Sequence, residues 1–212
     1  MSLAEPLPRE TTLESGGAAK GVAIAVVSQN KDDSGLGRVK VSYPWYSSPR
    51  DSYWARVAMP MSGKDRGVYF IPEVGDEVLV AFERGDVRFP YIVGSLWNGV
   101  EKSPQTNADG NNDIRQIKTR KGHKLTFDDG QKGLVRLELN DGKKLQIDDD
   151  GITVDDGSGN SLTIDSKGGA ITIQAAVSLS LKAPKIELQA SGTLDLKAGA
   201  TASVTGALVK IN

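Results

Sequence analysis

Cysteine is absent from the chain, so neither disulfides nor thiolate metal sites can form. Histidine is almost as scarce, because His123 is the only one among 212 residues. A single imidazole nearly excludes catalytic triads and zinc sites of histidine and cysteine within one chain. A three-fold axis could gather three copies of His123 around an ion, but its place in a Lys-Gly-His-Lys turn favours an exposed side chain. We therefore expect no catalytic residue, no metal site and no cofactor.

Long apolar runs are missing too. Nothing approaches the roughly 18 consecutive apolar residues of a transmembrane helix. The polar start, MSLAEPLPRETTLESGG, lacks the apolar core of a secretory signal peptide. The net charge is −1, so no global electrostatic attraction favours nucleic acid or an anionic membrane. We expect synthesis in the cytoplasm without a signal peptide, and no nucleic-acid partner.

What the sequence does contain is a regular repeat from Leu137 to Asn212. Pairs of the form apolar-x-apolar recur there, and the first members of ten pairs advance 72 residues in nine steps, a mean of eight. Alternate side chains of a strand point to opposite faces, so each pair places two apolar side chains on one face. The spacers are rich in Gly, Asp, Asn and Ser, which suit turns. The expected core consists of Leu145, Ile147, Ile152, Val154, Leu162, Ile164, Ile171, Ile173, Leu179, Leu181, Ile186, Leu188, Leu194, Leu196, Val204, Val209 and Ile211.

A strand that buries only two side chains cannot fold alone. Ordering each residue costs about 1–2 kcal/mol, whereas two buried aliphatic side chains return about 3–6 kcal/mol at most. Stacked strands of a single chain would still enclose a very thin core. Three chains wound about a common axis could fill it, so we predict a homotrimeric, triple-stranded intertwined β-helix. At about 4.8 Å per strand, ten strands would form a needle of about 50 Å.

The upstream part of the chain has a different composition. All three tryptophans and all five tyrosines lie between Tyr43 and Trp97. β-rich runs separated by turn clusters occupy residues 21–28, 37–43, 52–59, 68–71, 76–83 and 89–97. No segment shows a helical apolar period of useful length. Five or six short strands in this space favour a closed barrel of the oligonucleotide/oligosaccharide-binding (OB) type, since closure removes exposed edges. The whole chain is therefore predicted to be all-β.

The segment PEVGDEVLVAFERGD (72–86), followed by RFPYIVGSLWNG (88–99), resembles the OB domain of contractile-tail spike proteins. GRVKVSYP (37–44) and YWARVAMP (53–60) are similar to the same family. This family comprises phage baseplate assembly protein V, the valine–glycine repeat (VgrG) proteins of type VI secretion, and spikes of extracellular contractile injection systems. The resemblance is close over residues 20–100, and an octad β-helix after such a barrel fits the remainder. The motif residues are Pro72, Gly75, Asp76, Val78, Phe82, Gly85, Asp86, Pro90 and Gly94.

The resemblance implies a structural spike of a contractile injection machine, not an enzyme. It implies a trimeric baseplate hub protein at the barrel end, a PAAR-type tip protein (a small cone of proline-alanine-alanine-arginine repeats) on the C-terminal end, and transient contact with a target outer membrane. It also implies a protein made in the bacterial cytoplasm and assembled into the baseplate of a phage tail or injection particle. The expected contacts of the tip protein are Leu208, Val209, Lys210, Ile211 and Asn212.

Three features depart from some members of the family. Only about 20 residues precede the barrel, where VgrG proteins carry a large hub region, so either a separate protein supplies the hub or the chain is shortened. No lysozyme-like insert follows the barrel, and we carry over no wall-degrading activity. The terminal GALVKIN lacks the His-x-His iron-binding tip of some spikes.

The composition along the chain predicts four segments. They are an N-terminal arm (1–20), the barrel (21–100), a polar linker (101–116) and the β-helix spike (117–212), which we divide into a collar (117–151) and a regular needle (152–212). The stretch from Asp128 to Asp165 contains ten acidic and four basic residues, whereas the stretch from Ser166 onward contains five lysines and two acidic residues.

An acidic run at the junction of collar and needle could suggest other chemistry. Asp148, Asp149, Asp150, Asp155 and Asp156 lack the spacing of EF-hand loops and of calcium β-rolls, so solvated turn carboxylates are favoured. Paired carboxylates for glycoside hydrolysis are not excluded by counting acids. A β-helical tailspike polysaccharide depolymerase is therefore one alternative, although turns around a thin prism offer no long insertion to build a cleft.

A second alternative treats the barrel as a nucleic-acid-binding module. Its aromatic residues could stack on single-stranded bases, but such a channel also needs a basic groove, and nearby Lys and Arg are balanced by acids. Barrel core and subunit interface explain these aromatics better. They are Tyr43, Trp45, Tyr46, Tyr53, Trp54 and Tyr69.

Overall fold

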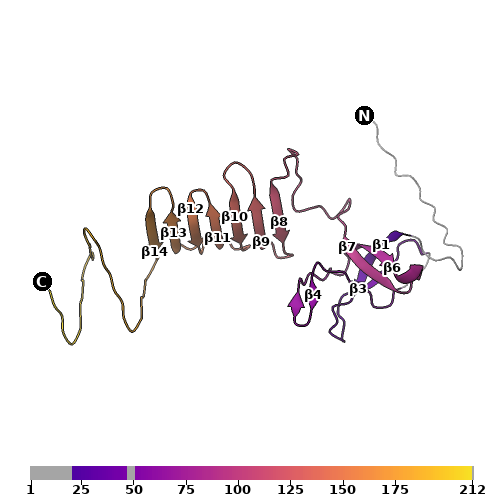
Figure 1. Cartoon of the computed structure of the whole chain (residues 1–212), viewed down its shortest axis with the longest axis horizontal. Coiled ribbons are helices and arrows are strands. Elements are labelled where there is room, and N and C mark those ends of the chain that lie inside the picture. The colour runs from indigo at the N-terminus through magenta and orange to yellow at the C-terminus, as the bar shows by residue number, and fades with distance from the viewer. Residues whose placement is uncertain (1–20, 47–50, 212) are drawn as a thin grey trace. The chain divides into compact units, whose positions relative to one another are not determined.

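The computed structural model describes residues 21–46 and 51–211, so the expected N-terminal arm and Asn212 lie outside the described residues. Apart from one short 3-10 turn, the regular elements are all strands. The chain divides into two compact units, Met1–Thr106 and Asn107–Asn212, and the division falls in the expected linker (Figure 1). Among the described residues, no helix has the length and hydropathy needed to cross a bilayer.

The first unit contains a closed five-stranded barrel. Its sheet order is β2-β1-β6-β7-β3, with β3 parallel to β7 and the other pairs antiparallel. A bridge between Val39 and Ala55 joins the two outer strands and closes the sheet. The strands are β1 (Val22–Gln29), β2 (Lys40–Ser42), β3 (Arg56–Val57), β6 (Glu77–Phe82) and β7 (Pro90–Ser95).

Small aliphatic side chains fill this barrel. Alternate residues of β6, Val78 and Val80, are fully buried, as the two-residue period of a half-buried strand requires. Tyr43 closes the core, and its hydroxyl donates to the carbonyl oxygen of Val87 at 3.0 Å. Burial raises the pKa of this phenol well above its usual range. The core residues are Ala25, Val27, Val39, Val41, Tyr43, Ala55, Val78, Val80 and Ile92.

Our prediction of a strand at residues 68–71 is wrong. A small hairpin precedes this run instead, formed by β4 (Ser62–Gly63) and β5 (Arg66–Gly67). Val68 donates one further hydrogen bond to the carbonyl oxygen of Met61, and no strand is assigned beyond it. Tyr69 and Phe70 are 79% and 61% exposed, whereas Ile71 is partly buried against the barrel core.

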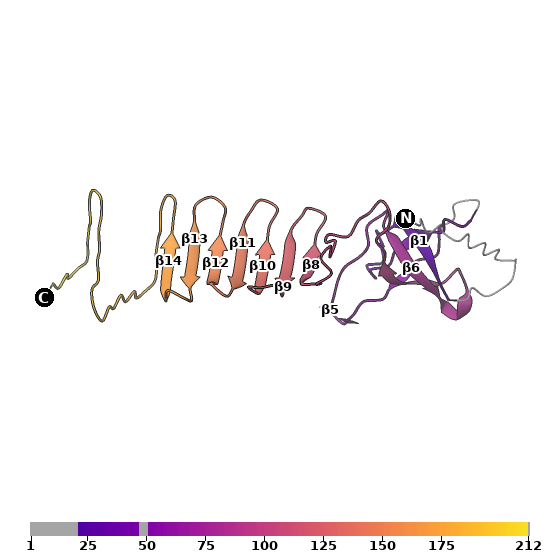
Figure 2. The same ribbon diagram turned by 90° about the horizontal axis from the view of Figure 1, so that it is seen from above.

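The second unit contains a seven-stranded antiparallel sheet whose strands follow one another in sequence order, β14-β13-β12-β11-β10-β9-β8. Figures 1 and 2 show this single row of hairpins. In the intertwined β-helix that we predicted, strands of different chains alternate, but β12, β13 and β14 pair within the chain just as the collar strands do. The strands are β8 (Ile114–Lys118), β9 (Lys124–Asp128), β10 (Leu134–Glu138), β11 (Lys144–Asp148), β12 (Gly151–Asp155), β13 (Ser161–Asp165) and β14 (Ala170–Gln174).

No strand is assigned among the described residues 175–211, although the apolar pairs of the repeat continue there. A strand needs a hydrogen-bonding partner, and these short pairs, separated by Gly, Ser and Ala, have none within the single chain. In an intertwined trimer that partner is another copy of the chain. Our prediction of strands in this segment therefore applies to the trimer and not to the single chain.

Candidate functional site

One face of the β8–β14 sheet is apolar over its whole length. The antiparallel register aligns alternate apolar residues into two rows, one across β9–β14 and one across all seven strands. The first row is Phe127, Val135, Ile147, Ile152, Ile164 and Ile171; the second is Ile117, Leu125, Leu137, Leu145, Val154, Leu162 and Ile173.

This apolar face is uncovered in the single chain. Leu162 is 36% exposed and Ile171 is 69% exposed, and most other members of the two rows lie between these values. The opposite face carries a central row of polar side chains: Gln116, Thr126, Arg136, Gln146, Thr153, Thr163 and Thr172. A contiguous exposed apolar patch on a soluble protein marks an interaction site. The apolar face is therefore the candidate assembly site.

The structure gathers only part of the expected core on this face. From Leu145 to Ile173 the eight expected residues all belong to the two rows. The expected residues from Leu179 to Ile211 lie in the strand-free segment instead. Of the expected tip contacts, Leu208, Val209 and Ile211 are 74%, 47% and 91% exposed.

Arg115 is a site residue that the repeat pattern does not reveal. It stands opposite Phe127 at the start of the first apolar row. Its guanidinium lies 2.6 Å from a carboxylate oxygen of Asp129 and donates to the carbonyl oxygen of Asn112 at 3.2 Å. The apolar row therefore ends in an ion pair at β8. A polar residue that breaks an apolar period was the only signal in the sequence.

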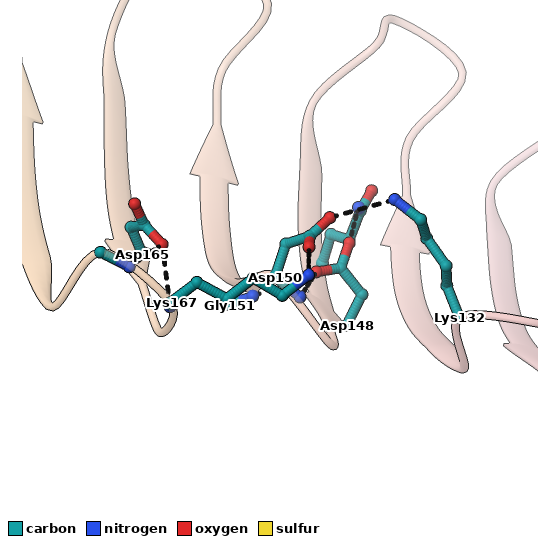
Figure 3. A network of polar contacts seen from close by, with 8 residues as sticks. Lys132, Asp148, Asp150, Gly151, Asp165 and Lys167 are labelled. Carbon is teal, nitrogen blue, oxygen red and sulfur yellow. Dashed lines mark hydrogen bonds and ion pairs between the residues drawn. The ribbon is translucent and has the colours of Figure 1, made fainter.

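Two of the collar carboxylates, Asp148 and Asp150, bind protein groups (Figure 3). Lys132 and Lys167, from the turns on either side, both pair with Asp150 and lower the pKa of its carboxyl, with the Lys167 hydrogen bond as the main cause. Asp148 accepts the backbone N–H groups of Asp150 and Gly151 at 2.9 and 3.1 Å. Within the described ranges, no group of three or more His, Cys, Asp or Glu side chains is arranged to hold a metal ion.

His123 joins two neighbouring turns. Its Nδ1 accepts a hydrogen bond from the backbone N–H of Asn140 at 3.3 Å, and the backbone N–H of His123 donates to the hydroxyl of Thr119 at 3.1 Å. The imidazole thus has a structural contact in the single chain.

The family motif of the barrel lies in two turns and the strands beside them. Gly75 has φ +101° and donates to the carbonyl oxygen of Val27, so a side chain there would be strained. Asp76 accepts the N–H of Glu73 at 2.8 Å and closes the same turn. Pro72 and Pro90 are buried, and Pro90 begins β7 opposite Phe82.

The second of these turns is fixed by charge. Gly85, with φ +81°, ends the 3-10 turn after β6. The carboxylate of Asp86 then accepts hydrogen bonds from two side-chain nitrogens of Arg88, and this contact lowers the pKa of the Asp86 carboxyl to about 2. Gly94 lies at a register shift opposite Leu79. The motif residues therefore have local structural roles.

Six aromatic side chains of the barrel pack in two groups. Tyr43, Trp45, Tyr46 and Phe82 pack together, with ring centroids 4.8 to 6.1 Å apart. Tyr53 is 61% exposed and stacks on Phe89. A core role thus fits Tyr43, with Trp45 and Phe82 packed against it, whereas Tyr46 is 37% exposed and Tyr53 lies on the surface.

Two family models match the chain. Residues 23–97 match the type VI secretion system/phage-baseplate injector OB domain. Residues 115–168 match the phage baseplate V C-terminal trimerisation domain, which covers most of the apolar face. The predicted all-β fold, an OB barrel followed by a trimeric β-helix, is therefore confirmed.

Curated relatives agree with these matches. "Type VI secretion system spike protein VgrG3" of Vibrio cholerae is 36% identical over 102 residues, 44% of this chain and 10% of that protein. "Type VI secretion system spike protein VgrG1c" of Pseudomonas aeruginosa is 32% identical over 103 residues, 47% of this chain and 14% of that protein. "Actin cross-linking toxin VgrG1" of Vibrio cholerae is 32% identical over 128 residues, 57% of this chain and 11% of that protein. The chain thus spans only about a tenth of the length of these relatives.

Proposed function

Because the chain belongs to the family of OB-domain spike proteins of phage baseplates and type VI secretion systems, we propose that it is the central spike of a contractile injection machine. In this role its homotrimeric β-helix is the shaft that pierces the target envelope. The protein acts by mechanical stiffness and catalyses no reaction.

The observation that carries the proposal is the uncovered apolar face of β8–β14, which coincides with the match to the trimerisation domain. Three such faces turned toward one axis would bury the two apolar rows of every chain. The β8–β14 strands already pair along the shaft within each chain, which stiffens it against bending. Force applied at the barrel would then pass along the axis.

The barrel is the part we expect to bind the trimeric baseplate hub. At the other end, Leu208, Val209 and Ile211 expose apolar side chains that a PAAR-type tip protein would cover. The spike would be made in the bacterial cytoplasm, join the baseplate there, and meet the outer membrane of the target only during injection.

Mass in solution is the first test of the proposal. Light scattering on the purified chain should give about three times 22.5 kDa, with an elongated shape. A monomer would contradict the proposal. The decisive test is functional: removing the gene from its host should abolish contraction-dependent injection, and the wild-type gene should restore it.

The tip contact has its own experiment. Val209→Asp with Ile211→Asp should abolish co-purification of a PAAR-repeat protein from the same genome, because two carboxylates would replace the apolar end. Thr205→Asp, a few residues before it, is the matched control and should bind normally. Equal binding by both variants would place the tip contact elsewhere.

The depolymerase alternative makes a separate prediction, namely release of oligosaccharides from capsule or lipopolysaccharide. We expect none from the wild-type trimer. The nucleic-acid alternative predicts salt-dependent binding of single strands to the barrel, and we expect no such binding.

A further inference from the structure

Successive turns of the β8–β14 sheet alternate between its two lateral edges, because each strand reverses the direction of the one before it (Figures 1 and 2). Figure 3 shows Lys132, Asp150 and Lys167 following one another along one of these edges. We call this the acidic edge; it comprises residues 113, 128–133, 148–150 and 165–169. The lysine edge, on the other side, comprises residues 118–124, 138–144 and 155–160.

The two edges carry opposite charge. The acidic edge has seven aspartates against Lys132 and Lys167, a net charge of −5. The lysine edge has six basic residues against Glu138, Asp141, Asp155 and Asp156, a net charge of +2, and four of the basic residues lie in its first turn, 118–124. The aspartates are Asp113, Asp128, Asp129, Asp148, Asp149, Asp150 and Asp165; the basic residues are Lys118, Arg120, Lys121, Lys124, Lys143 and Lys144.

The apolar face determines how these edges meet in a trimer. Its two rows run along the stack of strands, so a core shared by three such faces must have its axis along the rows. The strands then lie across the axis, and the turns of each sheet form the corners of the shaft. In a cyclic trimer every contact joins one edge of a copy to the opposite edge of the next copy.

We propose that the three copies join at these corners by contact between the acidic edge of one copy and the lysine edge of the next, and that this contact selects the parallel arrangement of the chains. The inference rests on the trimeric spike proposed above. The turns on the two edges are staggered by one strand, about 4.8 Å, so the turns of neighbouring copies interdigitate.

The opposite charges come together at the first lysine-edge turn of the sheet. The turn 118–124 carries four basic residues and lies between the levels of Asp113 and Asp129. The next lysine-edge turn carries Lys143 and Lys144 against Glu138 and Asp141, so it adds no net charge. Lys143 already pairs with Asp141, and Lys144 with Asp155. The third turn holds Asp155 and Asp156, so the complementarity belongs to the turn 118–124 at the start of the sheet and ends there.

Orientation follows from the same charges. A copy inserted upside down, with its apolar face still inward, exchanges its left and right edges. Its acidic edge would then meet the acidic edge of one neighbour, and its lysine edge the lysine edge of the other. The apolar rows alone do not discriminate strongly between the two orientations, because both orientations bury them. Like charges at the corners oppose the inverted copy.

Cross-linking tests the corner contact directly, because the chain has no cysteine of its own. In the full-length chain, Lys121→Cys with Asp129→Cys should give covalent trimers with a short bismaleimide, since each copy offers one thiol to each neighbour. Either substitution alone should stay monomeric on a denaturing gel. Cross-linked dimers of the Asp129→Cys variant would mean that like edges meet, and an uncross-linked trimer of the double variant would mean that the corners differ; either result overturns the proposal.

Charge substitutions provide a second test, because the same substitutions should have opposite effects on trimer stability in two backgrounds. Lys118→Glu with Lys121→Glu should weaken the wild-type trimer, raising its apparent dissociation constant about tenfold at low salt. In a chain that already carries Asp113→Lys and Asp128→Asn, the same two substitutions should strengthen the trimer, because they remove a repulsion. A five-residue strand separates the edges by about 17 Å, more than the screening length of about 8 Å, so this coupling has to arise between copies.

Thr153→Glu is the matched control, since it adds a charge to the polar face away from both edges, and it should leave dissociation unchanged. All differences should shrink at 1 M salt, where the screening length is about 3 Å. If the lysine-edge substitutions shift dissociation in the same direction in both backgrounds, the proposal is wrong. That outcome would leave the spike itself intact, whereas a monomeric wild-type chain would contradict the proposed function.

Discussion

The side-chain oxygen of Asn160 accepts a hydrogen bond from the backbone N–H of Ala176 at 2.9 Å. This contact ties the last turn of the lysine edge to the segment that follows β14. The amide nitrogen of Asn160 in turn donates to Asp156, which accepts the N–H of Ser158 as well. The point where the chain leaves its own sheet is therefore fixed by one side chain.

Replacing Asn160 should loosen this exit. Asn160→Ala removes the acceptor of the Ala176 N–H and the donor to Asp156, and we expect a loss of about 1–2 kcal/mol in local stability. Hydrogen exchange should accelerate at the Ala176 amide and in β14 but not in β8 or β9. Ser158→Ala is the control, because only the backbone of Ser158 makes a hydrogen bond in this turn. Unchanged exchange at Ala176 in the Asn160→Ala variant would disprove the role of this contact.

The two faces of the sheet should respond oppositely to charge. Leu162→Asp places an unpaired carboxylate in the shared core of the trimer, which costs several kcal/mol per chain, so the variant should be monomeric. Thr163→Asp, one residue further along β13, puts the same group on the polar face and should remain trimeric. Light scattering at matched concentrations distinguishes them. A trimeric Leu162→Asp variant would mean that this face is not the core.

Gly151 should be irreplaceable. Its φ is +149°, and a Cβ there would lie 1.8 Å from the carbonyl oxygen of Ile164, which is backbone and cannot rotate away. Gly151→Ala should therefore separate β12 from β13. A non-glycine residue with a left-handed backbone costs about 1–2 kcal/mol, and the free energy of unfolding should fall by well over this amount.

Gly142→Ala is the matched substitution in another hairpin turn. Gly142 has φ +92° but nothing lies within 4 Å of its Cβ position, so only the loss of about 1–2 kcal/mol is expected. Denaturant unfolding of both trimers measures the difference. Equal losses of unfolding free energy in the two variants would show that the structure around residue 151 rearranges to avoid the clash at no further cost in stability.

Acid should destabilise the barrel through Asp86. Its pKa is lowered to about 2 from an ordinary value near 3.9, because Arg88 binds the charged form. The stabilisation is thus complete above about pH 4 and is lost as the pH falls through about 2. Tryptophan fluorescence can follow barrel unfolding, since all three tryptophans lie in residues 45–97. The difference in stability between wild type and Asp86→Asn should vanish toward pH 2; a constant difference from pH 6 to pH 2 would contradict this account.

The sequence predicts the parts of this fold that depend on local pattern. The pairs from Leu145/Ile147 to Ile171/Ile173 have a two-residue period, and two-residue periodicity is what sorts side chains between the faces of a sheet. The family motif around Gly75 and Gly85 is visible because these backbone conformations favour glycine.

What the sequence does not reveal depends on pairing. Whether β12 bonds to β11 of its own chain or to another chain is a question of partners, and the apolar period is identical in both cases. The run 68–71 has β-rich composition but no neighbouring strand to pair with, so the prediction there is wrong. The Lys132–Asp150–Lys167 contacts join turns that are about 17 residues apart, and only the strand register brings them together.

Strict alternation of the turns has a consequence for how such a shaft can change in length. Adding a single strand would bring the chain out on the wrong side, and every turn after it would carry its charge to the opposite corner. Adding a whole hairpin of two strands restores the side and keeps all later charges in place. Growth or shortening of this sheet during evolution, or by design, should therefore proceed in hairpins, in steps of about 9.6 Å along the shaft.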